Sequence, residues 1–359
     1  MLSVRRWAVV VGGVAVLAAL PAAMGVLPIH QSAIGADQLL ARIRASAATP
    51  YQGYAESTGG LALPVTQQFK DVADLFGETT QLRAWYSGPH DWRVDTITVA
   101  GESDVDAGPD GTWTWDYESN RATWTGGVSP PDARLPVAAD LLPTNLGRRL
   151  LSEASTGQVT RLPAKRIAGR SAPGLRLVPH EPGSTIDRVD VWADERTGLP
   201  LRVDVHGSGT IVLSTRFLDF STDRPSPSDT VFVPPATAQV QTRDEPDIAA
   251  EIDKFSGDRV PPSLAGLPRN PALPGFGAIG VYGSGVTELV AVPLPDGVAF
   301  SLYRQLEDAA QTGKYGLTLS VGPLGLLLTS FNVSGGAWLL TGTVTPALLS
   351  RAASDLAPR

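Results

Sequence analysis

The sequence predicts an α+β fold that is rich in short β-strands. Charged residues make up only 18% of the chain, whereas glycine and proline are frequent, at 37 and 30 residues. Stretches in which apolar and polar residues alternate recur along the chain, separated by clusters of Gly, Pro, Asp and Asn. Alternation bounded by turn residues is typical of strands joined by tight turns.

Residues 1–36 are predicted to form an N-terminal signal-anchor, or transmembrane, segment. Arg5 and Arg6 precede an uncharged run from Trp7 to Ile29, about the ~20 apolar residues that a helix needs to cross a bilayer. Because the positive flank is N-terminal, the chain should leave the cytoplasm here. We expect a single-pass protein of the cell membrane whose bulk is extracytoplasmic. The alternative is a secreted or periplasmic protein, released when a signal peptide is cleaved near Gly25 or Ala36.

The first extracytoplasmic domain is expected to span residues 37–235. It opens with a helix over 37–48, because Leu39, Leu40 and Ile43 form an apolar stripe at helical spacing. A second helix is expected over 138–154, where leucines recur at similar spacing. The expected strands cover 51–57, 81–87, 92–99, 111–117, 121–125, 164–167, 174–178, 186–193, 199–206 and 210–220.

The rest of the chain is predicted to be a linker and a small C-terminal domain. The linker, residues 236–274, is rich in proline and includes a short acidic helix over 247–254. The C-terminal α+β domain spans 275–359, and Thr345 and Pro346 suit the start of its closing helix over 345–356. Its expected strands cover 278–282, 286–292, 297–302, 315–321, 325–331 and 337–343.

Several segments, taken in order, resemble one known family. They are Ala36-Asp37-Gln38-Leu39-Leu40, Pro50-Tyr51-Gln52-Gly53-Tyr54, Asp110-Gly111-Thr112-Trp113-Thr114-Trp115, Val189-Asp190-Val191-Trp192 with Thr197-Gly198-Leu199-Pro200, and Val231-Phe232-Val233. Their order and spacing over residues 37–235 resemble the LolA and RseB superfamily of extracytoplasmic lipoprotein-binding proteins. The C-terminal unit resembles the smaller C-terminal domain of RseB-like regulators.

The resemblance implies a curved, unclosed antiparallel β-sheet (a half-barrel) with covering helices and an apolar cavity for acyl chains. Strand side chains alternate between faces, so Trp113, Trp115 and Tyr117 should share one face. Aromatic side chains also often serve as packed core, and that alternative stays open. The candidate cavity-lining residues are Trp85, Trp92, Trp113, Trp115, Tyr117 and Trp124.

The function expected from these features is binding of lipid or lipoprotein acyl chains by a membrane-tethered extracytoplasmic protein. The partner is then the acyl chain, with a membrane protein as a further partner. The alternative is an RseB-like regulatory protein that binds a membrane partner, such as an anti-sigma factor or a transporter.

The acidic stretch from Glu102 to Asp110 is predicted to be a solvated hairpin loop. Asp104, Asp106 and Asp110 could bind a cation, but the stretch lacks the glycine-and-glutamate pattern of a calcium-binding loop. We therefore predict no metal site.

Other features argue against catalysis and against nucleic acid as a partner. The chain has no cysteine, and its net charge is −7 without a basic run, which disfavours nucleic-acid binding. Its histidines lie at neither catalytic nor metal-ligand spacing; they are His30, His90, His180 and His206. We expect no enzymatic activity, no catalytic residues and no cofactor.

Overall fold

The computed structural model describes residues 31–60, 79–97, 101–126, 136–243, 260–270, 278–330 and 336–357. Within these residues, no helix is both long enough and apolar enough to span a bilayer. The predicted membrane segment from Trp7 to Ile29 and the predicted helix over 247–254 lie outside the described residues.

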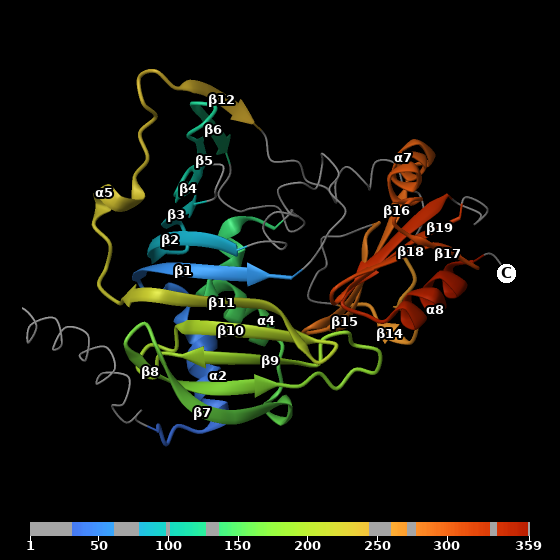
Figure 1. Cartoon of the computed structure of the whole chain (residues 1–359), viewed down its shortest axis with the longest axis horizontal. Helices are drawn as coiled ribbons and strands as arrows, with labels where there is room; N and C mark the ends of the chain where they lie inside the picture. The colour runs from blue at the N-terminus through green and yellow to red at the C-terminus, as the bar shows by residue number, and fades with distance from the viewer. Residues whose placement is uncertain are drawn as a thin grey trace, which may run out of the picture.

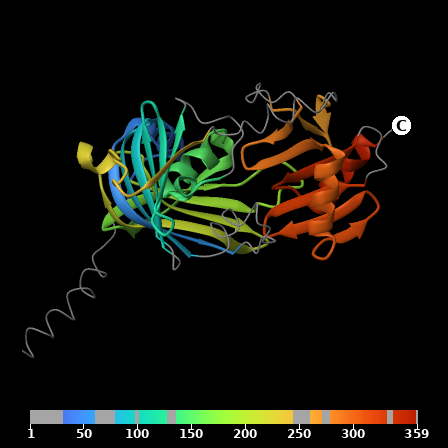
Figure 2. The same cartoon turned by 90° about the horizontal axis from the view of Figure 1, so that it is seen from above.

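A twelve-stranded curved sheet forms the larger part of the molecule (Figure 1 and Figure 2). Its spatial order is β12-β6-β5-β4-β3-β2-β1-β11-β10-β9-β8-β7. Two meanders, β1–β6 and β7–β11, join where β1 pairs with β11. The strands are β1 (Tyr51–Gly59), β2 (Thr79–Gly88), β3 (Asp91–Ile97), β4 (Glu102–Gly108), β5 (Gly111–Asp116), β6 (Arg121–Gly126), β7 (Val159–Ile167), β8 (Arg170–Leu177), β9 (Arg188–Ala193), β10 (Pro200–Gly207), β11 (Thr210–Ser221) and β12 (Gln239–Arg243).

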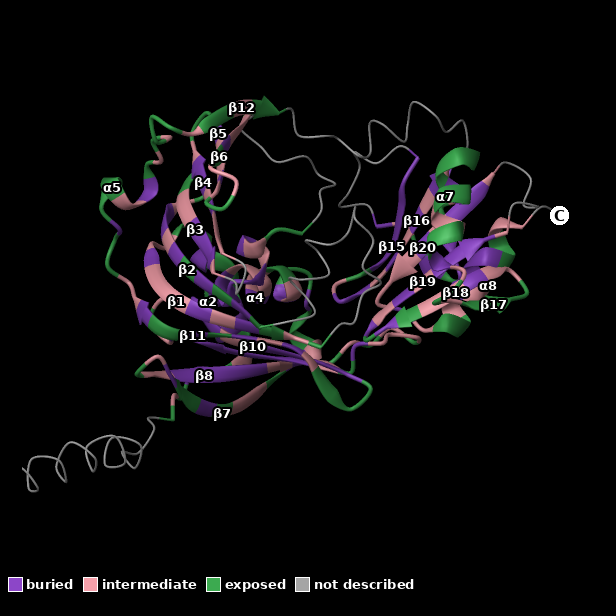
Figure 3. Cartoon of the chain, turned by 45° about the horizontal axis from the view of Figure 1, so that its top comes forward, coloured by how far each residue is buried: buried purple, intermediate pink, exposed green. Residues whose placement is uncertain are grey.

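Helices cover one face of this sheet, which we call the inner face; the opposite face is the outer face. Helix α4 (Pro143–Leu151) packs against β10, and α2 (Ala36–Ala45) packs against β7 and β8. Leu39 and Ile43 of α2 are fully buried in the resulting core. Three 3₁₀ turns, η1 (Ser46–Ala48), η2 (Ala138–Leu141) and η3 (Thr156–Gln158), complete this layer. Figure 3 shows the buried residues concentrated along the strands and helices of this core.

One described segment crosses the outer face and returns the chain to the far edge of the sheet. This segment, residues 222–238, is called the strap here, and it contains the short helix α5 (Pro227–Thr230). Helix α5 lies against β2, β3 and β4. The strap ends in β12, which pairs in parallel with β6.

The C-terminal domain is a six-stranded antiparallel sheet with a helix on each face. Its strand order is β15-β16-β20-β19-β18-β17. Leu327 and Leu328 are adjacent and point to opposite faces, one into the cluster under α8 and one into the cluster under α7. Its elements are β13 (Ser263–Leu264), β14 (Leu267–Pro268), β15 (Gly280–Ser284), β16 (Thr287–Leu294), α7 (Asp296–Leu306), β17 (Gln311–Gly313), β18 (Gly316–Val321), β19 (Leu324–Thr329), β20 (Ala337–Gly342) and α8 (Pro346–Leu356).

The connection between β8 and β9 joins the two domains through backbone hydrogen bonds. The Thr185 amide donates to the Thr343 carbonyl at 3.0 Å, and the Thr345 amide donates to the Gly183 carbonyl at 2.8 Å. An isolated bridge between Ser184 and Val344 lies between these bonds. The β8–β9 connection therefore pairs with the chain directly after β20, before α8 begins.

The β-rich fold with covering helices is confirmed, with three local corrections. Glu102 to Gly108 is a strand, β4, rather than a solvated loop, because Val105 and Ala107 face inward while Asp104 and Asp106 face outward. Residues 297–302 are helical, within α7, rather than a strand. The sheet is antiparallel in the described residues except at β12, which lies in the segment predicted to be linker.

Candidate functional site: an inner cavity and a polar outer face

The inner face encloses a cavity of about 540 Å³ over the β2–β6 part of the sheet. Helices α2 and α4 pack mainly on the β7–β11 part, so the inner side chains of β3, β4 and β5 are left to line an open space. The apolar lining residues are Tyr51, Ala84, Tyr86, Trp92, Val94, Val105, Ala107, Val137, Ala139 and Leu142. A mostly apolar concavity of this volume is typical of small-molecule sites.

Aromatic residues form one end of the cavity and connect it to the core. Tyr51 is fully buried and stacks on Tyr86 with ring centroids 5.1 Å apart. The Tyr51 hydroxyl lies 2.7 Å from Thr144 Oγ1 in α4, and the Tyr86 hydroxyl donates to the Ala47 carbonyl. Burial raises the pKa of Tyr51 to about 12. Both rings are therefore held rigidly by hydrogen bonds to the covering helices.

The opposite end of the cavity is polar. Thr112 and Thr114 of β5 and Thr125 of β6 line it, together with Arg243 of β12. Thr112 pairs with Thr125 across the two strands, which places both on the same face of the sheet. The cavity therefore has an apolar end and an end with hydroxyl and guanidinium groups.

The six aromatic candidates from the sequence divide between the two faces. Trp85 and Trp92 both border the cavity. Trp85 alternates with Ala84 and Tyr86, so its ring lies toward the outer face, beside the guanidinium groups of Arg83 and Arg93. The alternation of β5 places Trp113 and Trp115 on the face opposite to Thr112 and Thr114, so they are not among the lining residues.

The remaining two candidates belong with the outer group. Trp124 pairs with Trp113 across β5 and β6, and their rings lie 5.1 Å apart. Tyr117 follows β5 and is 57% exposed. Neither residue lines the cavity. The cavity role predicted for Trp113, Trp115, Tyr117 and Trp124 therefore does not match their positions.

The strap covers the outer aromatic group. The Phe232 ring lies 5.7 Å from the Trp113 ring and 5.9 Å from the Trp115 ring. The Asn120 side chain donates to the Thr237 carbonyl at 2.8 Å, which fixes the end of the strap beside β12. These tryptophans are therefore packing residues between the sheet and the strap.

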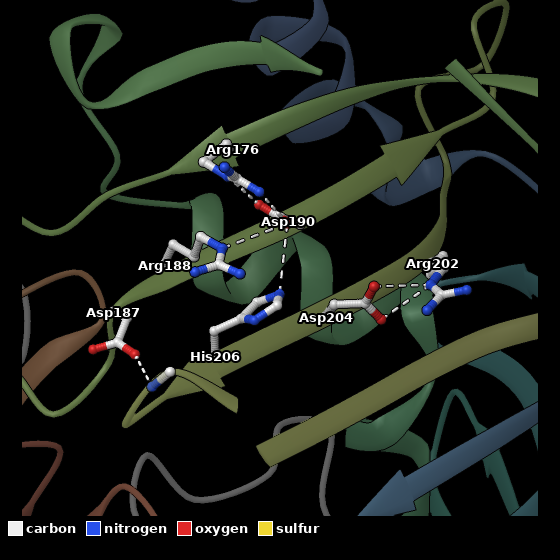
Figure 4. Close-up of polar contacts among 8 residues, drawn as sticks. Arg176, Asp187, Arg188, Asp190, Arg202, Asp204 and His206 are labelled. Atoms are coloured by element: carbon white, nitrogen blue, oxygen red, sulfur yellow. Dashed lines mark hydrogen bonds and ion pairs between the residues drawn. The ribbon is translucent and has the colours of Figure 1, made fainter. Parts of the chain in front are cut away.

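Two buried carboxylates, Asp190 and Asp204, lie among basic side chains on the outer face of β9 and β10 (Figure 4). Asp190 accepts two hydrogen bonds from Arg176, at 2.7 and 2.8 Å, and lies 3.5 Å from His206 Nε2. Asp204 accepts from Arg202 at 3.0 Å and from Ser214 at 2.7 Å. Burial lowers the pKa of His206, which favours the neutral imidazole.

A second group of carboxylates lies on the outer face of β3 and β4. Asp95, Asp104 and Asp106 are at most 3% exposed. Their ion pairs within the described residues go to Arg93, which is 2.5 Å from Asp95, 2.7 Å from Asp104 and 3.9 Å from Asp106. Burial, and then the charge of Asp95, raises the pKa of Asp104 to about 7; burial raises the pKa of Asp106 to about 6.

Sequence reasoning missed the residues that do most to shape the cavity. Tyr51, Tyr86 and the three cavity threonines are not among the sequence candidates. Their signal is present in the alternation Thr112, Trp113, Thr114, Trp115, where the threonines occupy the face opposite to the tryptophans. In β5 the large tryptophans suggest a ligand site, but the smaller threonines between them are the residues that face the cavity.

One family model and several solved structures are similar to this chain. The family model of the MucB/RseB N-terminal domain matches residues 136–240, which run from η2 to β12. Over these residues, the match confirms the predicted resemblance to RseB-like proteins. No curated protein matches the chain in sequence.

Three solved structures illustrate the structural likeness. The MucA/MucB complex of Pseudomonas aeruginosa is 16% identical, covers 88% of this chain and 95% of that chain, and has a TM-score of 0.47. An uncharacterized conserved protein from Thermus thermophilus is 12% identical, covers 58% and 98%, and has a TM-score of 0.36. A LolA superfamily protein from Nitrosomonas europaea is 12% identical, covers 56% and 99%, and has a TM-score of 0.26.

Proposed function

We propose that this protein binds an acyl chain of a lipid or lipoprotein in the inner cavity, and that it does so while tethered to the cell membrane on the extracytoplasmic side. The observation that carries the proposal is the cavity of about 540 Å³ with its largely apolar lining. The MucB/RseB family match and the uncharged run after Arg6 support the extracytoplasmic setting. Binding rather than catalysis is the activity proposed.

The two ends of the cavity suggest how an amphipathic ligand would lie. The hydrocarbon chain would lie against the apolar side chains that include Tyr51, Val94 and Leu142, because burial of apolar surface favours binding. The polar end of the ligand would lie toward Thr112, Thr125 and Arg243, which offer hydroxyl and guanidinium donors. The ligand class is therefore a single acyl chain with a polar or anionic end.

Binding should strengthen with chain length until the cavity is filled. Each buried methylene contributes about 0.8 kcal/mol, so each added carbon should lower Kd roughly fourfold. The measurement is displacement of a fluorescent fatty acid by unlabelled fatty acids of increasing length, with the full chain in detergent below its micelle concentration. A Kd that does not depend on chain length would contradict burial of the chain.

A variant that fills the cavity should abolish this binding without unfolding the protein. Ala107 lies on the inner face of β4 and lines the cavity, so Ala107→Phe places its ring in open space. The matched control is Val298→Phe on the exposed side of α7, where Val298 is 52% exposed. We expect at least a tenfold weaker Kd for Ala107→Phe, about 1.4 kcal/mol, and no change for the control. Equal affinities in both variants would place the ligand elsewhere.

A second candidate function is binding of a membrane protein, as in an RseB-like regulator. The MucB/RseB match and the separate C-terminal domain favour it. Crosslinking in membranes followed by affinity purification should then recover one membrane protein in stoichiometric amount. Recovery of lipid without such a protein would favour acyl-chain binding alone.

A further inference from the structure

The carboxylates of β3 and β4 lie on the face opposite to the cavity, so they have no place in acyl-chain binding. Asp95 and Asp104 are directly paired across the two strands, and Asp106 is paired with Arg93. Glu102, half-buried, lies on the same face of β4 two residues before Asp104. Oxygens of Asp95, Glu102 and Asp104 lie within 4.8 Å of one another.

The two outer-face groups differ in how their negative charge is balanced. Asp190 has Arg176, Arg188 and His206 as neighbours, and Asp204 has Arg202. In contrast, one guanidinium, that of Arg93, serves three buried aspartates in the described part of β3 and β4. Arg83, which pairs with Asp95 in register, has its guanidinium over the Trp85 ring instead. The β3–β4 group therefore keeps an excess of negative charge.

Carboxylate oxygens without a hydrogen-bond partner accompany this excess. The Arg93 guanidinium donates hydrogen bonds to one oxygen of Asp95 and to one oxygen of Asp104. The second oxygen of Asp104, Oδ1, is buried and has no hydrogen-bond partner within the described residues. Asp106 lies beside the group formed by Asp95, Glu102 and Asp104 and is only 3% exposed. Neither of its carboxylate oxygens has a hydrogen-bond partner within the described residues. Burying such oxygens without a partner is costly.

We propose that Asp95, Glu102 and Asp104 bind a calcium ion on the outer face of the β3–β4 hairpin, with Asp106 supplying further negative charge. Calcium prefers carboxylate oxygens at 2.3–2.6 Å. Two oxygens less than about 5.2 Å apart can both contact one ion at these distances, and the oxygens of this group lie within 4.8 Å of one another. Oxygen-only ligands favour a hard cation over zinc or copper.

A calcium ion at this site would stabilise the β3–β4 hairpin and the strap above it. Its ligands come from two neighbouring strands, and α5 of the strap lies over β3 and β4. Thr230 of α5 is also buried, and its hydroxyl has no hydrogen-bond partner in the described residues. A calcium ion here fastens the β3–β4 hairpin and completes the polar layer beneath the strap.

Terbium luminescence tests the site directly, because terbium replaces calcium and is excited by nearby tryptophan. Trp115 pairs with Asp104 and Trp113 with Asp106 across β4 and β5, so suitable donors are present. With the full chain, we expect terbium emission on tryptophan excitation that saturates and is reversed by added calcium. Calcium at ~100-fold above its Kd should also raise Tm by roughly 5 °C.

Two variants distinguish this site from general surface binding. Glu102→Gln replaces one half-buried carboxylate ligand with a neutral amide, and it should weaken terbium affinity at least tenfold without unfolding the protein. Asp110→Asn is the matched control, because Asp110 is an exposed turn residue of the same acidic stretch, and it should leave the affinity unchanged. Asp104→Asn should abolish the saturable signal.

Other outcomes would overturn the proposal. Emission that does not saturate, or that is equal in Glu102→Gln and Asp110→Asn, would show nonspecific binding. A Tm that is insensitive to calcium but rises as the pH is lowered would show that protons, rather than a cation, balance these carboxylates.

Discussion

Trp115→Ala is expected to lower the free energy of unfolding by about 3–5 kcal/mol, as for other buried tryptophan truncations. Trp115 is only 5% exposed and packs against Phe232 of the strap and against Tyr117. Its loss leaves a void between the sheet and the strap that neighbouring side chains cannot fill. Urea denaturation followed by fluorescence would measure the change.

Acyl-chain binding by the folded fraction of Trp115→Ala should be unchanged, because Trp115 faces away from the cavity. The companion variant is Trp92→Ala, in which a half-buried, cavity-lining ring is removed. Trp92→Ala should weaken acyl-chain binding at a smaller cost in stability. If Trp115→Ala instead lost binding and kept its stability, the aromatic residues of β5 would line the ligand site after all.

Tyr51→Ala should be comparably destabilising, by about 3–5 kcal/mol. Tyr51 is fully buried, and its ring contacts the rings of Tyr86, Phe217 and Phe220 at centroid distances of 5.1, 5.8 and 6.0 Å. Tyr51→Phe keeps these ring contacts and removes only the hydrogen bond to Thr144, so about 1 kcal/mol should be lost. Equal losses in the two variants would contradict the assignment of the effect to ring packing.

Wild-type protein and Tyr51→Phe should differ in how their free energy of unfolding depends on pH. Burial raises the pKa of Tyr51 from 10.0 to about 12 in the folded state. The neutral phenol is therefore favoured by folding, and its contribution is complete below pH 10 and is lost as the pH rises toward 12. Over this range wild-type protein should lose more stability than Tyr51→Phe.

The elements with regular patterns were predictable, and the exceptions have physical causes. The leucine spacing of α2 and the alternation of β10 mark both elements because one side of each is buried. Strand β4 is hard to predict because Asp is rare in strands; in the described residues, Asp104 and Asp106 form ion pairs with Arg93 of the neighbouring strand. The segment from Asp296 to Leu306 has a strand-like pattern because Val298 and Phe300 alternate with smaller residues, yet both are exposed on α7.

The sequence predicts which side chains of a strand share a face, but it does not predict which face of the sheet holds the cavity. Alternation shows that Trp113 and Trp115 share a face, and the structure places them together on the outer side. Which face is concave depends on the direction in which the sheet curves and on where α2 and α4 pack. Those contacts join residues far apart in the chain, so local spacing contains no information about them.

The seam between β1 and β11 has a consequence for how the chain folds. Gln52 pairs with Ser221 and Tyr54 with Asp219, whereas the strands within each meander pair with their chain neighbours. Contacts of such high sequence separation slow folding, because a long loop must close before they form. Each meander can assemble on its own, but the half-barrel is incomplete until β11 has emerged. A chain exported in an unfolded state from its N-terminus would thus keep the edge of β1 unpaired until most of the first domain had crossed, and this interval is when aggregation would compete with folding.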